Sequence, residues 1–343
     1  MANVFMTGFE WGTKYEVSWW DAWGMCAIDA TNVRSGNYSM KLYGAYAAFS
    51  QSLAGGKNEY YVQFAYNTDG AFGSLGGSIL NWYGSYGNRR IGYLNFSDTG
   101  QARLYTVTHP DGLNENSVLR AVGLKRLRTN AWYVLELHIK ADQNFGALAL
   151  RIDGTPDCDF AGATSEYSPG TIDAMTWAHW SCYIDDIVIN DTLGDFNNSW
   201  PGCLKVVLLR PNDDGGSSQW TKSIEGHNYD CVNEVPYDTS QYVYTYGLDQ
   251  LDLYGLQDLP EEAADVMVVR GDAWAFKDSG SEAQNRKLAF SVQAGMTIND
   301  SPDQNLALSY DLVKYPFDFS PDTNAIWTKE EVNNIQAGIK SRA

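Results

Sequence analysis

The sequence lacks the features that mark several large classes of protein. No window approaches the 18 or so consecutive apolar residues of a membrane-spanning helix. The first residues show no basic stretch followed by an apolar one, so we expect no signal peptide.

Charged residues make up only 19%, and the net charge is −18. Such a surface repels phosphate groups, so we expect neither a nucleic acid nor a membrane as a partner. The basic cluster Lys125 to Arg128 is interpreted as a solvated edge or an interface.

Cysteine is scarce and carries no pairing pattern. The five cysteines are odd in number, widely spaced, and form no CxxC pair. This argues against both a disulfide framework and a zinc site. We therefore expect free, buried thiols in a protein made in a reducing cytoplasm. These cysteines are Cys26, Cys158, Cys182, Cys203 and Cys231.

Motifs for catalysis are also missing. The chain has no GxSxG elbow, no glycine-rich phosphate loop and no metal spacing among its four histidines. Glucanases of lectin-like fold carry an E-x-D-x-x-E strand, which is absent; Asp185 and Asp186 are adjacent, so strand alternation points them to opposite faces. His227, Cys231 and Glu234 lie close in sequence and could form a thiol site, but a structural role is favoured. We expect no enzymatic activity.

The residues that are abundant indicate an all-β protein. The 343 residues include 32 Gly, 22 Tyr, 13 Phe and 12 Trp, a composition typical of short aromatic strands between glycine turns. Apolar and polar residues alternate from Tyr60 to Tyr66 and from Tyr133 to Lys140. A further strand, Leu148 to Ile152, ends at the tight-turn pair Asp153-Gly154. Two antiparallel sheets packed face to face would bury these stripes.

One stretch, residues 183–202, divides the chain. Its first half is rich in β-branched residues and predicts a strand, and its second half is rich in Gly, Asn, Asp and Pro. We therefore predict a first jelly-roll-like domain over 1–195, a linker over 196–202 and a second β-sandwich domain over 203–343.

The sequence of the second domain also predicts mostly strands. We expect strands at 204–209, 242–244, 266–269 and 287–290, with a surface turn over 211–218. One short helix is predicted near the C-terminus, over 327–339. Thr328 and Glu331 form a capping box there, and the apolar positions Val332, Ile335 and Ile339 share one face.

The order of motifs in the first domain resembles the concanavalin A-like, laminin-G-like jelly roll. These motifs are Gly8-Phe9-Glu10, Arg34 to Leu42, Trp132 to Leu137, Ile152-Asp153-Gly154 and Tyr183 to Ile189. The resemblance implies a structural calcium ion that joins the first strand to the last, with Glu10, Asp185 and Asp186 as its ligands. The alternative, that Asp185 and Asp186 cap turns or face solvent, stays open. No other cofactor is expected.

The second half resembles structural proteins of tailed bacteriophages. The motifs that carry this resemblance are Pro211 to Thr221, Asp252 to Pro260 and Trp327 to Gly338. It implies a non-enzymatic virion component, such as a decoration or fibre-like subunit of the head or tail, made in the cytoplasm of a bacterial host. Other virion proteins and further copies of the chain are the expected partners.

A carbohydrate-binding module that recognises a host glycan is the alternative function. Seven aromatic residues could stack against sugar rings, although core or interface packing also explains them, and no glycan-binding residue is assigned. They are Trp19, Trp20, Trp23, Trp82, Tyr83, Trp177 and Trp180.

Overall fold

The chain forms two compact units, residues 2–206 and 207–343, in a computed structural model. The structure describes residues 3–17, 25–44, 47–70, 72, 77–84, 89–109, 114–168, 170–280 and 286–343. These residues contain many antiparallel strands and a single short α-helix, so the all-β prediction is confirmed. No helix in these ranges is long and apolar enough to cross a membrane.

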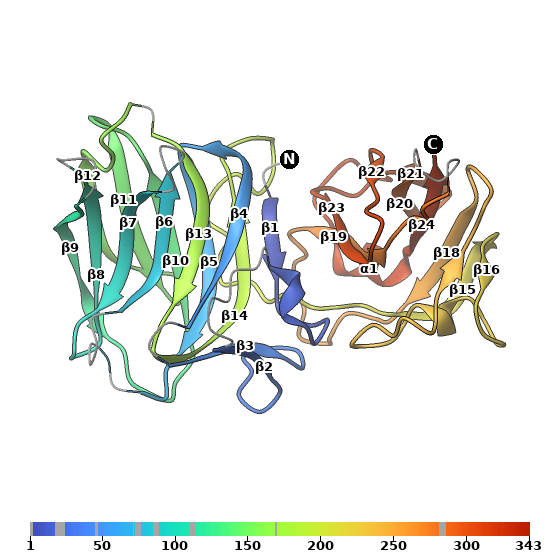
Figure 1. Cartoon of the computed structure of the whole chain (residues 1–343), viewed down its shortest axis with the longest axis horizontal. Helices are drawn as coiled ribbons and strands as arrows, with labels where there is room; N and C mark the ends of the chain where they lie inside the picture. The colour runs from blue at the N-terminus through green and yellow to red at the C-terminus, as the bar shows by residue number, and fades with distance from the viewer. Residues whose placement is uncertain are drawn as a thin grey trace. The chain divides into compact units, whose positions relative to one another are not determined.

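Two antiparallel sheets build the first unit (Figure 1). In spatial order, the eight-stranded sheet contains β12 (Thr155–Gly162), β11 (Gly146–Ile152), β10 (Tyr133–Lys140), β5 (Glu59–Asn67), β14 (Ser181–Asn190), β3 (Ser39–Tyr43) and β2 (Cys26–Asp29), with β1 (Asn3–Thr7) also paired to β14. The six-stranded sheet contains β4 (Ala48–Lys57), β13 (Ile172–Ala178), β6 (Ser78–Gly84), β7 (Arg89–Phe96), β8 (Gln101–Thr108) and β9 (Asn116–Arg126). A short 3-10 helix, η1 (Lys14–Glu16), follows β1.

The core of this unit lies between the two sheets. Every second residue of β5, from Tyr60 to Tyr66, is buried there, as the alternation predicts. The Trp177 ring stacks on Phe49 at 5.3 Å and meets Phe64 edge-on at 6.1 Å. Strand order and core together make the unit an antiparallel sandwich of the jelly-roll kind.

The turn between β11 and β12 has the geometry that its sequence demands. Asp153 and Gly154 have φ angles of 53° and 74°, both in the left-handed region. A two-residue hairpin with two left-handed residues matches the strand twist. The Asp153 carboxylate also accepts a hydrogen bond from Val134 N at 2.9 Å, so this predicted turn is confirmed and anchored to β10.

The second unit is built on a six-stranded antiparallel sheet. In spatial order it contains β15 (Pro211–Ser218), β18 (Leu251–Leu256), β24 (Gln336–Arg342), β20 (Lys287–Ala294) and β21 (Thr297–Asp300), with β22 (Gln304–Asn305) also paired to β20. Two small sheets accompany it, β16 (Thr221–Lys222) with β17 (Val243–Tyr244) and β19 (Val269–Ala275) with β23 (Asp311–Phe317). Its other elements are η2 (Tyr229–Cys231) and α1 (Lys329–Asn334).

Three strand and turn predictions for this half are wrong. Residues 204–210 form no strand. Leu204 N and Val206 N donate to the side chains of Gln63 and Asp186 instead of to a ladder, and Arg210 exchanges hydrogen bonds with Gln257. Residues 266–268 are also irregular, and the strand begins at Val269. The predicted surface turn over 211–218 is the bulged strand β15, which pairs with β18.

The predicted C-terminal helix is correct at its start and wrong at its end. Thr328 and Glu331 form the capping box, but the helix stops at Asn334 and Ile335 is already extended. Ile339 lies in β24, opposite Asp252 and Phe290. The apolar spacing 332, 335 and 339 fits a helix. However, β18 and β20 lie on either side of this segment and offer hydrogen-bond partners to both of its edges, which favours a strand.

All five cysteines are free, as predicted. Cys26, Cys182 and Cys231 are buried, whereas Cys158 and Cys203 are partly exposed. Burial raises the pKa of Cys158 to about 12, so its thiol stays protonated and unreactive at neutral pH.

Candidate functional site

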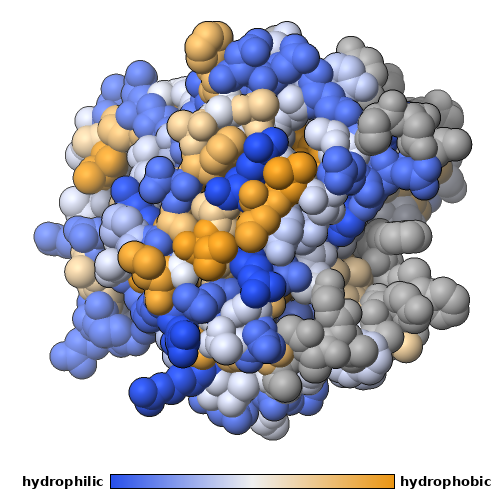
Figure 2. All heavy atoms as spheres, turned by 90° about the vertical axis from the view of Figure 1, so that its left-hand side faces the viewer, coloured by the Kyte–Doolittle hydropathy of each residue, from blue (hydrophilic) through white to orange (hydrophobic). Residues whose placement is uncertain are grey.

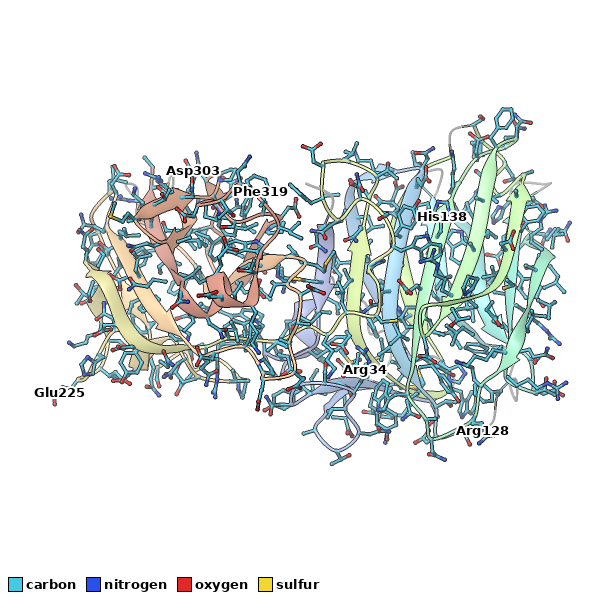
Figure 3. The ribbon with its side chains drawn as sticks, turned by 180° about the vertical axis from the view of Figure 1, so that it is seen from behind. Arg34, Arg128, His138, Glu225, Asp303 and Phe319 are labelled. Carbon is cyan, nitrogen blue, oxygen red and sulfur yellow. The ribbon has the colours of Figure 1, made fainter. Side chains whose placement is uncertain are left out.

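The predicted calcium ligands form a buried carboxylate cluster around the turn between β2 and β3. Glu10 accepts hydrogen bonds from Asn37 N at 2.9 Å and Tyr38 N at 3.4 Å. Asp185 accepts from Arg34 N at 3.0 Å. Arg34, labelled in Figure 3, also pairs through Nη1 with Asp186 at 2.5 Å. The structure therefore brings all three predicted residues to one turn.

A bulge in β14 overrides the alternation expected for Asp185 and Asp186. Asp186 has a φ of 46°, and the pairing of β14 with β5 shifts between Asp185 and Val188. Both carboxylates consequently reach the same turn, because Ser35 Oγ donates to Asp186 at 2.8 Å while Ser35 N lies 3.4 Å from Asp185. The prediction of opposite faces is wrong for this reason.

The turn itself is shaped to receive a carboxylate. Gly36 has a φ of 62°, and the Glu10 carboxylate occupies the place where a β-carbon at Gly36 would stand. Only glycine fits this position without moving Glu10.

Burial dominates the electrostatics of the cluster. It raises the pKa of Glu10 to about 7, against the opposing effect of the hydrogen bonds from Asn37 and Tyr38. Burial also raises the pKa of Asp185, and the neighbouring Asp186 charge raises it further. Of the three carboxyl groups, Asp186 pairs with the guanidinium of Arg34, whereas Glu10 and Asp185 are held by backbone N–H groups of the turn.

The carboxylate oxygens face hydrogen-bond donors and not one common point. Each of the three groups already accepts from backbone or side-chain N–H or O–H groups. Within the described ranges, no group of three or more His, Cys, Asp or Glu side chains could hold a metal ion. As these side chains lie, they fit a structural clasp, and a calcium ion stays a prediction from the family resemblance.

Residues 200–206, here called the strap, are held by this cluster and by the outward face of the eight-stranded sheet. Val206 N donates to Asp186 at 2.7 Å, Leu204 N to Gln63 at 2.7 Å and Gly202 N to Glu136 at 2.8 Å. Trp200 covers the guanidinium of Arg151 at 4.0 Å. Gln63 and Glu136 are fully buried, although their strands direct them away from the core.

The aromatic residues considered for sugar stacking divide into three groups. Trp82 and Trp177 are buried in the core and cannot meet a ligand. Tyr83 is partly exposed, and 44% of Trp180 is exposed. Trp19, Trp20 and Trp23 lie outside the described residues.

A second candidate site is the outward face of the six-stranded sheet. Strand pairing places one residue from each strand in a row across this face. The neighbouring residues in the central strands, Leu80, Leu94 and Leu104, point to the opposite side and are buried in the core. The row is Ser50, Thr176, Asn81, Tyr93, Tyr105 and Leu119. Its members are hydroxyl, amide and aromatic side chains, apart from the leucine at the edge.

The centre of this row is a stack of three planar groups. The rings of Tyr93 and Tyr105 have centroids 4.6 Å apart and are nearly parallel, and the guanidinium of Arg90 lies over the Tyr93 ring, 4.6 Å from its centroid. Arg90 is fixed by Asn81 Oδ1 at 3.2 Å and by an ion pair with Glu115. Neither tyrosine hydroxyl has a hydrogen-bond partner among the described residues. The face therefore presents preordered donors and acceptors.

Strand β9 borders this face with exposed apolar side chains. Leu119, Val122 and Leu124 are 46%, 46% and 84% exposed. Figure 2 looks onto this end of the first unit and shows apolar side chains in a band between hydrophilic ones.

A small pocket opens at the ends of β6, β7 and β8, next to Arg90. Arg89, His109, Glu166 and Tyr167 are among its lining residues. His109 N donates to Glu166 at 2.8 Å, and His109 Nδ1 lies 3.5 Å from the other carboxylate oxygen. Sequence reasoning missed this pair because the two residues are 57 positions apart.

The sequence neighbours His227, Cys231 and Glu234 do not form a thiol site. The His227 ring pairs with Asp214 at 2.8 Å, and Cys231 is buried with its thiol directed at the His227 carbonyl, 3.8 Å away. The imidazole therefore does not activate the thiol, and the structural role favoured from the sequence agrees with this geometry.

No protein family and no curated protein matches this sequence. Among solved structures, the chain is similar to a cellulose induced protein, Cip1, with 17% identity over 54% of this chain and 96% of that one, at a TM-score of 0.41. It is similar to an alginate lyase from Chlorella virus, with 12% identity over 49% of this chain and 90% of that one, at a TM-score of 0.38. It is also similar to a carbohydrate binding module from Bacillus subtilis, with 8% identity over 49% of this chain and 96% of that one, at a TM-score of 0.32. At these scores the likenesses identify neither a ligand nor an activity for this chain.

Proposed function

We propose that the chain is a glycan-binding protein whose first unit binds an oligosaccharide on the outward face of the six-stranded sheet. The observation that carries this proposal is the row from Ser50 to Leu119, with its Arg90–Tyr93–Tyr105 stack. Sugars offer many hydroxyl groups and apolar C–H faces, and such a row matches both with hydrogen-bonding side chains beside aromatic rings.

Preordering supports the same role. Arg90 is held by Asn81, Glu115 and the Tyr93 ring, and Ser50 is hydrogen-bonded to Thr176 at 2.7 Å. Side chains that are fixed before binding lose little conformational entropy when the ligand arrives. A face of freely rotating polar residues would lose more.

The test is glycan binding by the intact chain and by Tyr105→Ala. We expect binding on a glycan array to be lost or weakened at least tenfold in the variant, because one ring of the stack and one free hydroxyl disappear. Trp180→Ala, which removes an exposed aromatic outside the row, is the control and should bind like the parent. Binding that Tyr105→Ala leaves unchanged would exclude this face as the site.

A role in a bacteriophage particle, with other virion proteins and further copies of the chain as partners, stays a prediction from the sequence resemblance. Detection of the chain in purified particles by mass spectrometry would test it without reference to the glycan site.

A further inference from the structure

Strands β7 to β9 are basic in an acidic protein. Residues 89–128 contain seven Lys or Arg and three Asp or Glu, a net charge of +4, whereas the whole chain carries −18. These three strands form one half of the sheet face described above. Of these cations, Arg90, Arg103 and Arg126 belong to the outward face, whereas Lys125 is ion-paired with Asp153 and Arg120 lies over the Phe160 ring of β12.

Arg103 is the most informative of these cations. It is partly buried on the outward face, directly opposite Asn95 of β7 and Val122 of β9. Its side chain has no hydrogen bond or ion pair among the described residues. Asn95 Oδ1 is buried and also lacks a partner. By contrast, Arg34 and Arg270 are paired with carboxylates. A partly buried guanidinium left unpaired in a chain rich in carboxylates indicates an anion supplied from outside.

Two further arginines extend this arrangement across the face. Arg90 lies near the opposite end of β7, roughly 17 Å from the level of Arg103 at about 3.3 Å per strand residue, where Glu115 already pairs with its guanidinium. Arg126 of β9 is exposed and lies opposite Gln101 of β8. The tyrosine stack lies between Arg90 and Arg103 along the strands. Charged and stacking groups thus alternate over a length that suits a chain of sugars.

We propose that the ligand of this face is an acidic polysaccharide, whose carboxylate or sulfate groups pair with Arg103 and Arg126 while its rings contact Tyr93 and Tyr105. This inference rests on the proposed glycan-binding function. Guanidinium groups bind carboxylate and sulfate oxygens through two parallel hydrogen bonds, which neutral sugars cannot accept with the same strength. The overall charge of −18 opposes nucleic acid, whose phosphates follow one another more densely than two separated arginines can neutralise.

Binding to matched charged and neutral polymers distinguishes recognition of charge from recognition of sugar shape. Binding of the full chain would be measured by calorimetry to polygalacturonate, to its methyl ester, to dextran sulfate and to unmodified dextran. We expect binding to one of the two anionic polymers at least tenfold tighter than to its neutral counterpart, and a loss of affinity as salt rises from 50 to 500 mM, about the range over which screening becomes strong. The preferred polymer then distinguishes carboxylate from sulfate.

Arg103→Gln tests the residue assignment. Removing one charge-assisted bidentate contact should weaken binding to the anionic polymer about tenfold and leave any binding to its neutral counterpart unchanged. Arg151→Gln makes the same charge change on the other sheet, where the side chain packs on Trp200, and should have no effect. A cooperative thermal unfolding transition in each variant would show that both are folded.

The outcomes separate the two proposals. Equal affinity for an anionic polymer and its neutral counterpart, with loss in Tyr105→Ala, overturns the acidic ligand and leaves glycan binding standing. No binding to any glycan overturns both. An oligonucleotide bound as tightly as the acidic polysaccharide, with the same dependence on Arg103, would show that the face recognises polyanions in general and would also overturn the inference.

Discussion

The carboxyl groups of Glu10, Asp185 and Asp186 are buried around one positive charge, that of Arg34. Hydrogen bonds from the Arg34–Tyr38 turn compensate part of the cost of burying them. Because the compensation is incomplete, burial raises the pKa values of Glu10 and Asp185. Protonation relieves this cost. The cluster is thus a clasp whose strength depends on pH.

We predict that acidification stabilises the first unit. A carboxyl group whose pKa is about 7 in the fold and near 4.5 when unfolded binds more protons in the fold across that interval. The free energy of unfolding then falls as pH rises from about 4.5 to 7, with a slope on the order of 1 kcal/mol per pH unit. Asp185, whose pKa is raised to about 8, extends the fall to about pH 8. Thermal unfolding measured between pH 5 and pH 8 should show a higher midpoint at pH 5.

Glu10→Gln supplies the check on this assignment. The variant cannot titrate, so its midpoint should vary less with pH than that of the parent, whereas the exposed Asp98→Asn should keep the parent's slope. If the midpoint instead rises with pH in the parent, the clasp does not behave as described. A calcium-dependent rise at pH 8 that Glu10→Gln abolishes would support the predicted ion.

The sequence locates these residues but not their geometry. Glu10, Asp185 and Asp186 could be selected because their motifs resemble a known family, and the Asp153-Gly154 turn because two residues demand left-handed backbone. The bulge at Asp186 could not be predicted, since it depends on the fit between β14, β5 and the Arg34 turn. The sheet face with Tyr93 and Tyr105 was missed for a similar reason. Its residues belong to six strands, and only their register brings them into one row.

At the scale of elements, strand pairing decides where local pattern is ambiguous. The segment after Asn334 has apolar residues at helical spacing, yet it forms the strand β24 between β18 and β20. The capping box fixes only the first turn, and propensity is too weak to exclude the strand. Hydrogen bonding to two neighbouring strands with unpaired edges outweighs this helix propensity.

Gly338 gives a test in which helix and strand predict opposite signs. In a helix, Gly338→Ala would stabilise by about 1 kcal/mol. In β24, the new β-carbon would collide with the backbone carbonyl of Asp252 in β18, so we expect destabilisation by about 2–3 kcal/mol. Urea unfolding measures the difference. Gly216→Ala in β15, whose β-carbon would meet nothing closer than 3.5 Å, is the control and should change stability little.

At the scale of the whole molecule, the segment that joins the two units belongs structurally to the first. The strap, residues 200–206, satisfies Gln63, Glu136 and Asp186 on the outward face of the eight-stranded sheet. Sequence composition marks residues 196–202 as a linker because Gly, Asn and Pro gather there. Composition cannot show that irregular backbone is needed here to place N–H groups over buried side chains.

This role predicts that the position of a truncation determines the stability of the first unit. A fragment ending at Val206 keeps the strap, whereas a fragment ending at Asp195 loses Trp200 and three backbone donors. The shorter fragment exposes Gln63 and Glu136 and leaves Asp186 without the Val206 N–H. Losing several kcal/mol should lower its unfolding midpoint by on the order of 10 °C. A third fragment, ending at Val206 with Trp200→Ala, separates the contributions, because it keeps the backbone donors and loses only the ring, which contacts Arg151, Tyr61 and His138. We expect it to unfold between the other two, and equal midpoints for all three would show that the strap does not stabilise the sheet.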